Sequence, residues 1–160
     1  MSTGDSLPFS VTLHVRDHCL CLHAQRAARA LARRFDAALA PVDLTNGQFS
    51  LLMSLNRPQP PLMGDVATLL AMDRTTLTAA LKVLERRGLV RVRVDADDRR
   101  GRRLALTAKG KKTLARAYPI WVATHEEIER ELADPDRTRA DLRTISDEQK
   151  RHNDNATTFA

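Results

Sequence analysis

The sequence lacks the long apolar segments that mark membrane and secreted proteins. No stretch reaches the roughly 18 consecutive apolar residues that a membrane-spanning helix needs. Residues 1–10 have neither the basic start nor the apolar run of a secretory signal. We therefore expect a cytoplasmic protein with no membrane partner.

Motifs of common enzymes are also missing. The chain contains no GxSxG, no HExxH and no glycine-rich phosphate loop, and no cysteine and histidine are paired with an orienting partner. We expect no enzymatic activity and no cofactor. There is no internal repeat, and 42% hydrophobic residues in 160 are enough for one packed domain with extensions.

Positive charge, in contrast, is plentiful and concentrated. The net charge is +6, and residues 82–112 hold twelve Lys or Arg against four Asp or Glu, a local excess of +8. Such a patch favours a polyanionic partner. Nucleic acid fits better than a membrane, because no basic helix with a bulky apolar face accompanies the patch. A merely solvated surface is the alternative.

The spacing of apolar residues predicts helices in the first half of the chain. Residues 11–39 contain no proline, and their apolar side chains recur at threes, fours and sevens, which predicts one long amphipathic helix. Thr45 followed by Gln48 is a capping-box pattern that opens a second helix over residues 46–55. A third, short helix is expected over residues 62–70.

A fourth helix completes a helix-turn-helix pattern. Asp73 suits its N-cap and Gly88 its end. Two short helices about three residues apart match a helix-turn-helix, although the turn at residues 71–73 lacks the expected glycine. The predicted core face of the fourth helix consists of Leu77, Ala80, Leu81 and Leu84.

A β-hairpin and two more helices follow. Apolar and basic residues alternate over residues 89–94 and again over residues 102–106, which predicts two strands joined by an arginine-rich turn. From Thr107 a helix runs to about residue 133. Asp134 and Pro135 then suit the N-cap and first position of a last helix.

The stretch from Asp73 to Gly110 resembles the MarR family of bacterial regulators. The resemblance rests on LERRGLV at the end of the fourth helix, DADDRR in the hairpin turn and LTAKG at the start of the next helix, and it covers about residues 10–150. It implies a mainly α fold with a small β-wing, that is, a winged helix-turn-helix with dimerisation helices at both ends.

The resemblance also implies a domain plan and a partner. The expected partner is double-stranded DNA with an inverted-repeat operator, bound by a homodimer that acts as a repressor. A dimer agrees with the pattern of the chain, because a first helix of nearly thirty residues and a sparse last helix would bury little within one subunit. The expected segments are a flexible N-terminus (1–9), an N-terminal dimerisation helix (10–40), the winged helix-turn-helix (41–106), C-terminal dimerisation helices (107–155) and a frayed tail (156–160).

DNA contacts are predicted on the fourth helix and on the wing. Hydroxyl and basic side chains can read base edges in the major groove or hold phosphates. The resemblance implies that Arg100 enters the minor groove while Asp98 steadies the loop, and an arginine there reads groove width more than sequence. The predicted base contacts are Thr75, Thr76, Thr78 and Ala79, and the predicted phosphate contacts are Arg74, Lys82, Arg99, Arg102 and Arg103.

The two cysteines and nearby histidines suggest alternatives for a signal. Within a continuous helix, Cys19 and Cys21 would point to nearly opposite sides and could not close a disulfide without unwinding. Cys21 lies near the position of the reactive cysteine in the family's organic-hydroperoxide sensors, so a redox switch is one hypothesis and an inert thiol the other. His14, His18 and Cys21 at helical spacing could supply three metal ligands, but a fourth ligand is not evident and we expect no metal.

A small-molecule inducer is the main expectation for the signal. Most members of the family respond to a small, often aromatic molecule bound between the dimerisation helices and the DNA-binding lobe. Such a ligand acts if it binds the DNA-incompetent arrangement more tightly than the competent one. The residues expected to line this ligand site are Phe49, Met53, Met63 and Trp121, and plain core packing is their alternative role.

A winged-helix module for protein contacts is the alternative to DNA binding.

Overall fold

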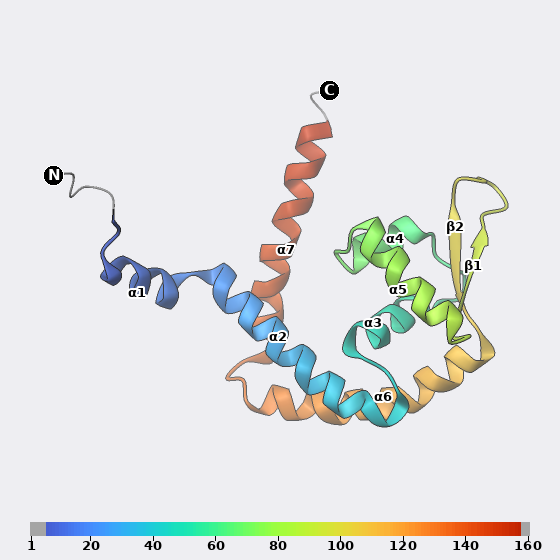
Figure 1. The fold of residues 1–160 in the computed structure, drawn as a ribbon, viewed down its shortest axis with the longest axis horizontal. Coiled ribbons are helices and arrows are strands. Elements are labelled where there is room, and N and C mark those ends of the chain that lie inside the picture. Colours follow the sequence, from blue (N-terminus) through green and yellow to red (C-terminus); the bar gives the residue numbers. More distant parts are fainter. Residues whose placement is uncertain (1–5, 158–160) are drawn as a thin grey trace. The chain divides into compact units, whose positions relative to one another are not determined.

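A computed structural model describes residues 6–157 of the chain, with side chains as far as residue 146 (Figure 1). The chain divides into two compact units, Met1–Trp121 and Val122–Ala160, and each is described by itself. The predicted flexible N-terminus and frayed tail fall partly outside the described residues. Where they are described, the first helix begins at Phe9 and the last one continues to Thr157.

The N-terminal region consists of two helices where one was predicted. Helix α1 spans Phe9–His18 and helix α2 spans Leu20–Leu39. The prediction of an uninterrupted helix is wrong at Cys19, whose backbone is extended (φ −74°, ψ 105°). No proline or glycine lies in this segment. The Cys19 Sγ instead caps α2 by accepting a hydrogen bond from the Leu22 N–H.

Three short helices follow where the sequence pattern predicts them. A single 3-10 turn, η1 (Ala40–Val42), leads to α3 (Asn46–Ser54). The predicted capping box is present: the Thr45 hydroxyl accepts from the Gln48 N–H, and the Gln48 side chain accepts from the Thr45 N–H. Helix α4 spans Met63–Leu69 and helix α5 spans Arg74–Arg86, with Asp73 as the predicted N-cap.

The turn between α4 and α5 explains how the motif forms without a glycine. Ala71 adopts the left-handed conformation (φ 51°) that a glycine would normally take. The Met72 N–H donates to the Ala67 carbonyl at 2.9 Å, which closes the end of α4. The helix-turn-helix is therefore intact, at the cost of a strained alanine.

The wing is a two-stranded antiparallel hairpin. Strand β1 (Val90–Val94) pairs with strand β2 (Arg102–Leu106), with Val92 opposite Leu104. Gly88, at φ 69°, ends α5 and turns the chain into β1, as the sequence predicts. This turn places the hairpin directly after α5 (Figure 1).

The core of the first unit consists mainly of leucines from the helices and strands around the motif. Side chains with 2% exposure or less come from the end of α2, from α3, α4, α5 and α6, and from both strands. Helix α6 (Ala108–Arg130) closes this core with Leu114 and Ala117 and passes Pro119 without ending. The most buried side chains are Leu39, Leu51, Leu52, Val66, Leu77, Leu81, Leu84, Leu89 and Leu104.

The second unit contains the end of α6 and helix α7 (Pro135–Thr157). The predicted cap is present, because the Asp134 carboxylate accepts from the Arg137 N–H at 2.8 Å. Arg139 pairs with Glu129 of α6 and with Asp136, and these ion pairs raise the pKa of its guanidinium. The pairing with Glu129 links α6 to the first turns of α7.

Candidate nucleic-acid interface

Helix α5 has one buried face and one exposed face. Leu77, Leu81 and Leu84 are buried, which turns the opposite side of the helix to solvent. A shallow surface hollow on this side is lined by five of the six residues predicted on α5, all except Thr76: Arg74, Thr75, Thr78, Ala79 and Lys82.

The three threonine hydroxyls of α5 differ in what they already bind. Thr76 donates to the Asp73 carboxylate at 2.7 Å and is part of the helix cap, and these hydrogen bonds from the Thr76 N–H and hydroxyl hold the pKa of Asp73 below its ordinary value. Thr78 donates to the Arg74 carbonyl at 2.7 Å. Thr75 is exposed, and its hydroxyl has no partner among the described residues.

The exposed surface of α5 extends one helical turn beyond the residues predicted from the sequence. A second hollow shares Ala79 and Lys82 with the first and adds Glu85 and Arg86. Glu85 accepts a hydrogen bond from the Val92 N–H and so joins the helix to the wing. Arg86 was not among the contacts predicted from the sequence. It lies four residues after Lys82 and therefore on the same face of the helix, a spacing that could have identified it.

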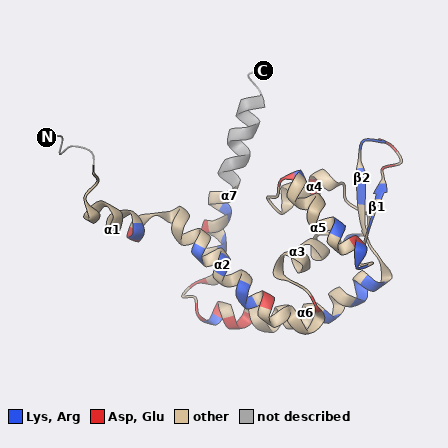
Figure 2. Cartoon of the chain, viewed as in Figure 1, with Lys and Arg blue, Asp and Glu red and all other residues tan. Residues whose placement is uncertain are grey.

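The tip of the wing presents two arginines. The Asp98 carboxylate accepts from the Arg100 N–H at 2.9 Å, and the Asp98 carbonyl accepts from the Gly101 N–H at 2.8 Å, so Asp98 shapes the turn as the resemblance implies. Arg99 and Arg100 are exposed, and neither side chain makes a hydrogen bond or ion pair within the described part of the chain. Both guanidinium groups are therefore available to an external partner. Figure 2 shows basic residues in blue along α5 and the wing.

The other two predicted wing arginines are engaged within the protein. Arg103 pairs with the buried Asp95 (Nε to Oδ2, 2.6 Å) and donates to the Pro60 carbonyl at 3.1 Å. The geometry therefore favours a structural role for Arg103 over the predicted phosphate contact. Arg102 donates through one Nη to the carbonyls of Arg99 and Gly101, yet it remains exposed.

Two polar clusters hold α5 and the wing in place. Arg87, just after α5, donates to the Gln48 side chain at 3.1 Å and pairs with Asp43 at 2.7 Å. Thr107, just after the wing, donates to the Gly88 carbonyl at 2.6 Å and accepts from the Gly110 N–H at 2.9 Å. Both ends of the α5–wing segment are thus fixed to the rest of the first unit.

An apolar hollow lies between α3 and α6 in the first unit. Three of the four predicted ligand-contacting residues line it, namely Phe49, Met53 and Trp121, together with Tyr118 and Leu69. The Trp121 ring stacks near Phe49, Tyr118 and Phe35, with centroid separations of 6.1, 6.3 and 6.5 Å. The structure does not bring Met63 to this hollow.

The alternative metal set is not assembled. His14 and His18 stack at 4.2 Å on α1, but the break at Cys19 removes Cys21 from their helix. Within the residues that the structure describes, no group of three or more His, Cys, Asp or Glu side chains could hold a metal ion. The same residues include no helix that is long and apolar enough to cross a membrane.

These elements define a class of protein. Two helices joined by a tight turn, followed by a β-hairpin with a basic tip, form a winged helix-turn-helix. The chain matches the model of the MarR family over residues 42–101. Its structure resembles that of the Mycobacterium tuberculosis regulator MosR in complex with DNA, with a TM-score of 0.77 and 38% identity over 83% of this chain and 97% of that one.

Two further relatives agree with this match. The transcriptional repressor CouR, bound to a 23-mer DNA duplex, has a TM-score of 0.70 and 32% identity over 89% of this chain and 97% of that one. The transcriptional regulator HosA of Escherichia coli O127:H6 is 40% identical over 88 residues, which are 54% of this chain and 64% of that protein. The chain belongs to the MarR family.

Proposed function

We propose that the protein is a homodimeric transcriptional repressor that binds double-stranded DNA at an inverted-repeat operator in the cytoplasm. The observation that carries this proposal is the pairing of an exposed polar face on α5 with two unengaged arginines at the tip of the wing. MosR and CouR, both solved with DNA, share this fold at 38% and 32% identity.

In the proposed complex α5 lies in the major groove and the wing in the minor groove. Thr75 and Ala79 meet base edges or thymine methyl groups, while Arg74, Lys82 and Arg86 hold phosphates on either side. Arg100 enters the minor groove, where a narrow A·T-rich segment concentrates negative potential. Arg99 and Arg102 contact the adjoining backbone.

The proposed dimer is supported by apolar side chains that one chain leaves exposed. Helix α1 buries no residue, and its Phe9 is 71% exposed. Helix α7 exposes Leu142 (50%) and Ile145 (56%). A second copy that covers these helices would remove this apolar surface from water and would set the spacing of the two recognition helices.

Fluorescence anisotropy with DNA from upstream of the coding region tests the proposal. Arg100→Ala should weaken binding on the order of tenfold or more, within the 1–3 kcal/mol expected of a specific groove contact. Arg33→Ala, which removes the same charge from an exposed site on α2, is the matched control and should bind normally. If all three proteins bind this DNA with equal and specific affinity, the proposed contact by Arg100 is wrong. If none binds it more tightly than random DNA while the dimer is intact by light scattering, a protein-interaction module is favoured instead.

The proposed signal is a small aromatic molecule bound in the hollow between α3 and α6. Phe49, Tyr118 and Trp121 offer ring faces, while Ser50, Asn56 and Arg57 at the same hollow offer polar groups. CouR of Rhodococcus jostii RHA1, a structural neighbour with a TM-score of 0.70 and 20% identity, has been solved with p-coumaroyl-CoA, a ligand that carries an aromatic ring.

A tryptophan-fluorescence titration tests the proposed ligand site. Trp121 is the only tryptophan of the chain, so quenching by an aromatic carboxylate reports on this hollow. Met53→Arg should abolish the quenching, because the longer charged side chain would fill the hollow. Met63→Arg, at a residue that does not line the hollow, is the control. Loss of binding in both variants, or in neither, would contradict this site.

A further inference from the structure

A basic stripe runs along α2 on the side that faces away from the core. The buried Phe35 follows Arg26 by nine residues, which is about two and a half helical turns, and therefore lies on the opposite side of the helix. Residues 18–35 contain no Asp or Glu. The basic stripe lines a shallow hollow together with Ala27 and Ala30, and it consists of His23, Arg26, Arg29 and Arg33.

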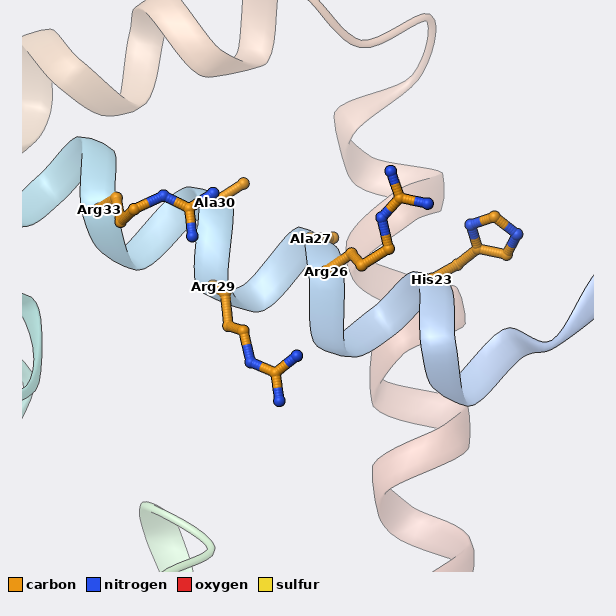
Figure 3. Close-up of a pocket in the computed structure, with 6 residues that line it drawn as sticks. All are labelled: His23, Arg26, Ala27, Arg29, Ala30 and Arg33. Carbon is orange, nitrogen blue, oxygen red and sulfur yellow. The ribbon is translucent and has the colours of Figure 1, made fainter. Parts of the chain in front are cut away.

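The arginines of the basic stripe have no acidic partner in the first unit. Arg26 and Arg33 are exposed, and neither makes a hydrogen bond or an ion pair within the part of the chain that the structure describes. Arg29 donates to the Gln25 side chain, one turn earlier on the same helix, at 3.2 Å. Figure 3 shows Arg26 and Arg29 extending from different sides of α2. Their positive charges are therefore available to an external partner.

The surroundings of the basic stripe favour a protein partner over a nucleic acid. Ala27 and Ala30 lie between the charged side chains, and their small size lets another helix approach closely. Leu20 and Leu31, on the same helix, are exposed as well. A DNA duplex would supply phosphates to the arginines but would leave this apolar surface in water. A helix with both acidic and apolar side chains matches both features.

The chain itself contains such a segment at the end of α6 and in the turn that follows. Residues 122–136, which we call the acidic segment, hold six Asp or Glu against one Arg, a net charge of −5. Glu129 already pairs with Arg139. Glu126 and Glu127, in contrast, are exposed and make no hydrogen bond or ion pair with any residue that the structure describes. Leu132 of the same segment is exposed too.

The symmetry of a dimer restricts what the basic stripe can contact. In a two-fold symmetric dimer each contact occurs twice, and a surface on the axis meets its own copy. The basic stripe on the axis would place arginines against arginines, and such like-charge contacts oppose association. The acidic segment on the axis would have the same defect. Pairing of the basic stripe with the acidic segment of the other copy joins opposite charges at both contacts.

We propose that the basic stripe of one copy pairs with the acidic segment of a second copy, and that this pairing makes the chain select its own kind as a partner. The inference rests on the proposed homodimer. The exposed apolar side chains of α1 and α7 favour association but discriminate little between related chains, whereas charges placed opposite each other fix the register and reject other partners. The basic stripe contributes Arg26, Arg29 and Arg33, and the acidic segment contributes Glu126 and Glu127.

Charge reversal tests this pairing, with sedimentation velocity and native mass spectrometry of the full-length protein. Arg26→Glu/Arg29→Glu reverses the basic stripe, and Glu126→Lys/Glu127→Lys reverses the acidic segment. Each double variant should weaken the homodimer by about tenfold or more, because like charges then meet at both contacts. An equimolar mixture of the two variants should form dimers again, and nearly all of them should be heterodimers, whereas random pairing would give about half.

Two controls separate this effect from a folding defect. Lys112→Glu/Arg116→Glu makes the same change of charge at exposed positions of α6 outside the acidic segment, and it should leave the homodimer unchanged. In 1 M salt, where the screening length falls to about 3 Å, the homodimers of both reversed variants should partly recover, which a misfolded protein would not do. Removal of a single arginine, as in Arg33→Ala, should be tolerated because several exposed pairs share the effect.

The outcomes decide between this pairing and other arrangements. Reversed variants that dimerise like the wild type would overturn the proposal. Loss of the dimer in both variants without recovery in the mixture would indicate pairing within one chain, and would overturn it as well. A monomeric wild type would contradict the proposed homodimer and with it this pairing. The anisotropy titration then decides separately whether the chain binds DNA.

Discussion

Asp95 and Arg103 form an ion pair across the base of the wing, with 2.6 Å between Oδ2 and Nε. Asp95 is only 5% exposed, and its other carboxylate oxygen accepts from the Asp97 N–H at 2.8 Å. One buried carboxylate thus fixes both the first turn of the wing tip and the start of the return strand. The tip arginines depend on this arrangement for their position.

The pairing of Asp95 predicts a pH-dependent contribution to stability. The hydrogen bond from the Asp97 N–H, aided by Arg103, holds the pKa of Asp95 below its ordinary value. The contribution is therefore complete above the unfolded pKa of about 3.9 and is lost as the pH falls through the lower folded value. Asp95→Asn should lower the free energy of unfolding in urea at pH 7, and this difference from the wild type should shrink below about pH 4.

The neighbouring Asp97 supplies the control for that measurement. Asp97→Asn removes the same charge from an exposed side chain. Asp97 donates to the Asp95 carboxylate through its backbone N–H, which the substitution keeps. It should leave the unfolding free energy unchanged at pH 7. Equal destabilisation by both substitutions would show that net charge, and not the Asp95 ion pair, is responsible.

Gly110, near the start of α6, is predicted to tolerate no side chain. A Cβ at this position would lie 2.1 Å from the Leu89 carbonyl oxygen and 3.0 Å from its carbon. Because the obstacle is backbone, Gly110→Ala should destabilise the protein by about 3 kcal/mol, at the upper end of the usual cost of overpacking. Gly47→Ala, in α3 with nothing within 4 Å of the added carbon, should be neutral or stabilising by up to about 1 kcal/mol. Comparable unfolding midpoints for the two variants would contradict this close approach.

Ala71 predicts an unusual response to glycine. An alanine at φ 51° costs about 1–2 kcal/mol relative to right-handed backbone. A glycine avoids this strain, but it lowers the free energy of unfolding by about 0.4–1 kcal/mol because it gives the unfolded chain more conformational freedom. Ala71→Gly should therefore raise the free energy of unfolding by up to about 1 kcal/mol. The same substitution at Ala28, in the exposed middle of α2, should lower it by about 1 kcal/mol. Thermal unfolding distinguishes the two, and a loss of stability at both sites would contradict a strained turn.

Local signals explain why much of the fold was predictable. A helix cap, a left-handed turn and the alternation along a strand all depend on short-range rules. The structure confirms the predictions made from them, which are the Asp73 cap, the turn at Gly88 and strand β1 with its alternating valines. The break at Cys19 was not predictable, because the residues around it are compatible with a continuous helix. The left-handed Ala71 was missed for a similar reason: the turn is imposed by the packing of two helices, not by a residue that prefers it.

The candidate site shows the same division between local and long-range causes. The exposed face of α5 follows from helical spacing, so Arg74, Thr75, Ala79 and Lys82 were predicted together. The pairing of Arg103 with Asp95 joins residues eight positions apart across a hairpin. Charge composition alone cannot distinguish such an arginine from an unpaired one, and only the register of the strands shows the difference.

The different hydrogen bonds of Thr75 and Thr78 predict which threonine reads the DNA. The Thr78 hydroxyl donates a hydrogen bond to the Arg74 carbonyl, whereas the Thr75 hydroxyl, on the exposed face, has no partner among the described residues. Thr75→Val keeps the shape and the methyl group but removes the donor, so operator affinity should fall on the order of tenfold, with little change in affinity for random DNA. Thr78→Val should change either affinity by less than about twofold, because the interaction that it loses is internal to the helix. Anisotropy titrations on operator and random duplexes measure both ratios. A larger loss of specificity in Thr78→Val would mean that the Thr78 hydroxyl turns away from the Arg74 carbonyl when DNA is bound.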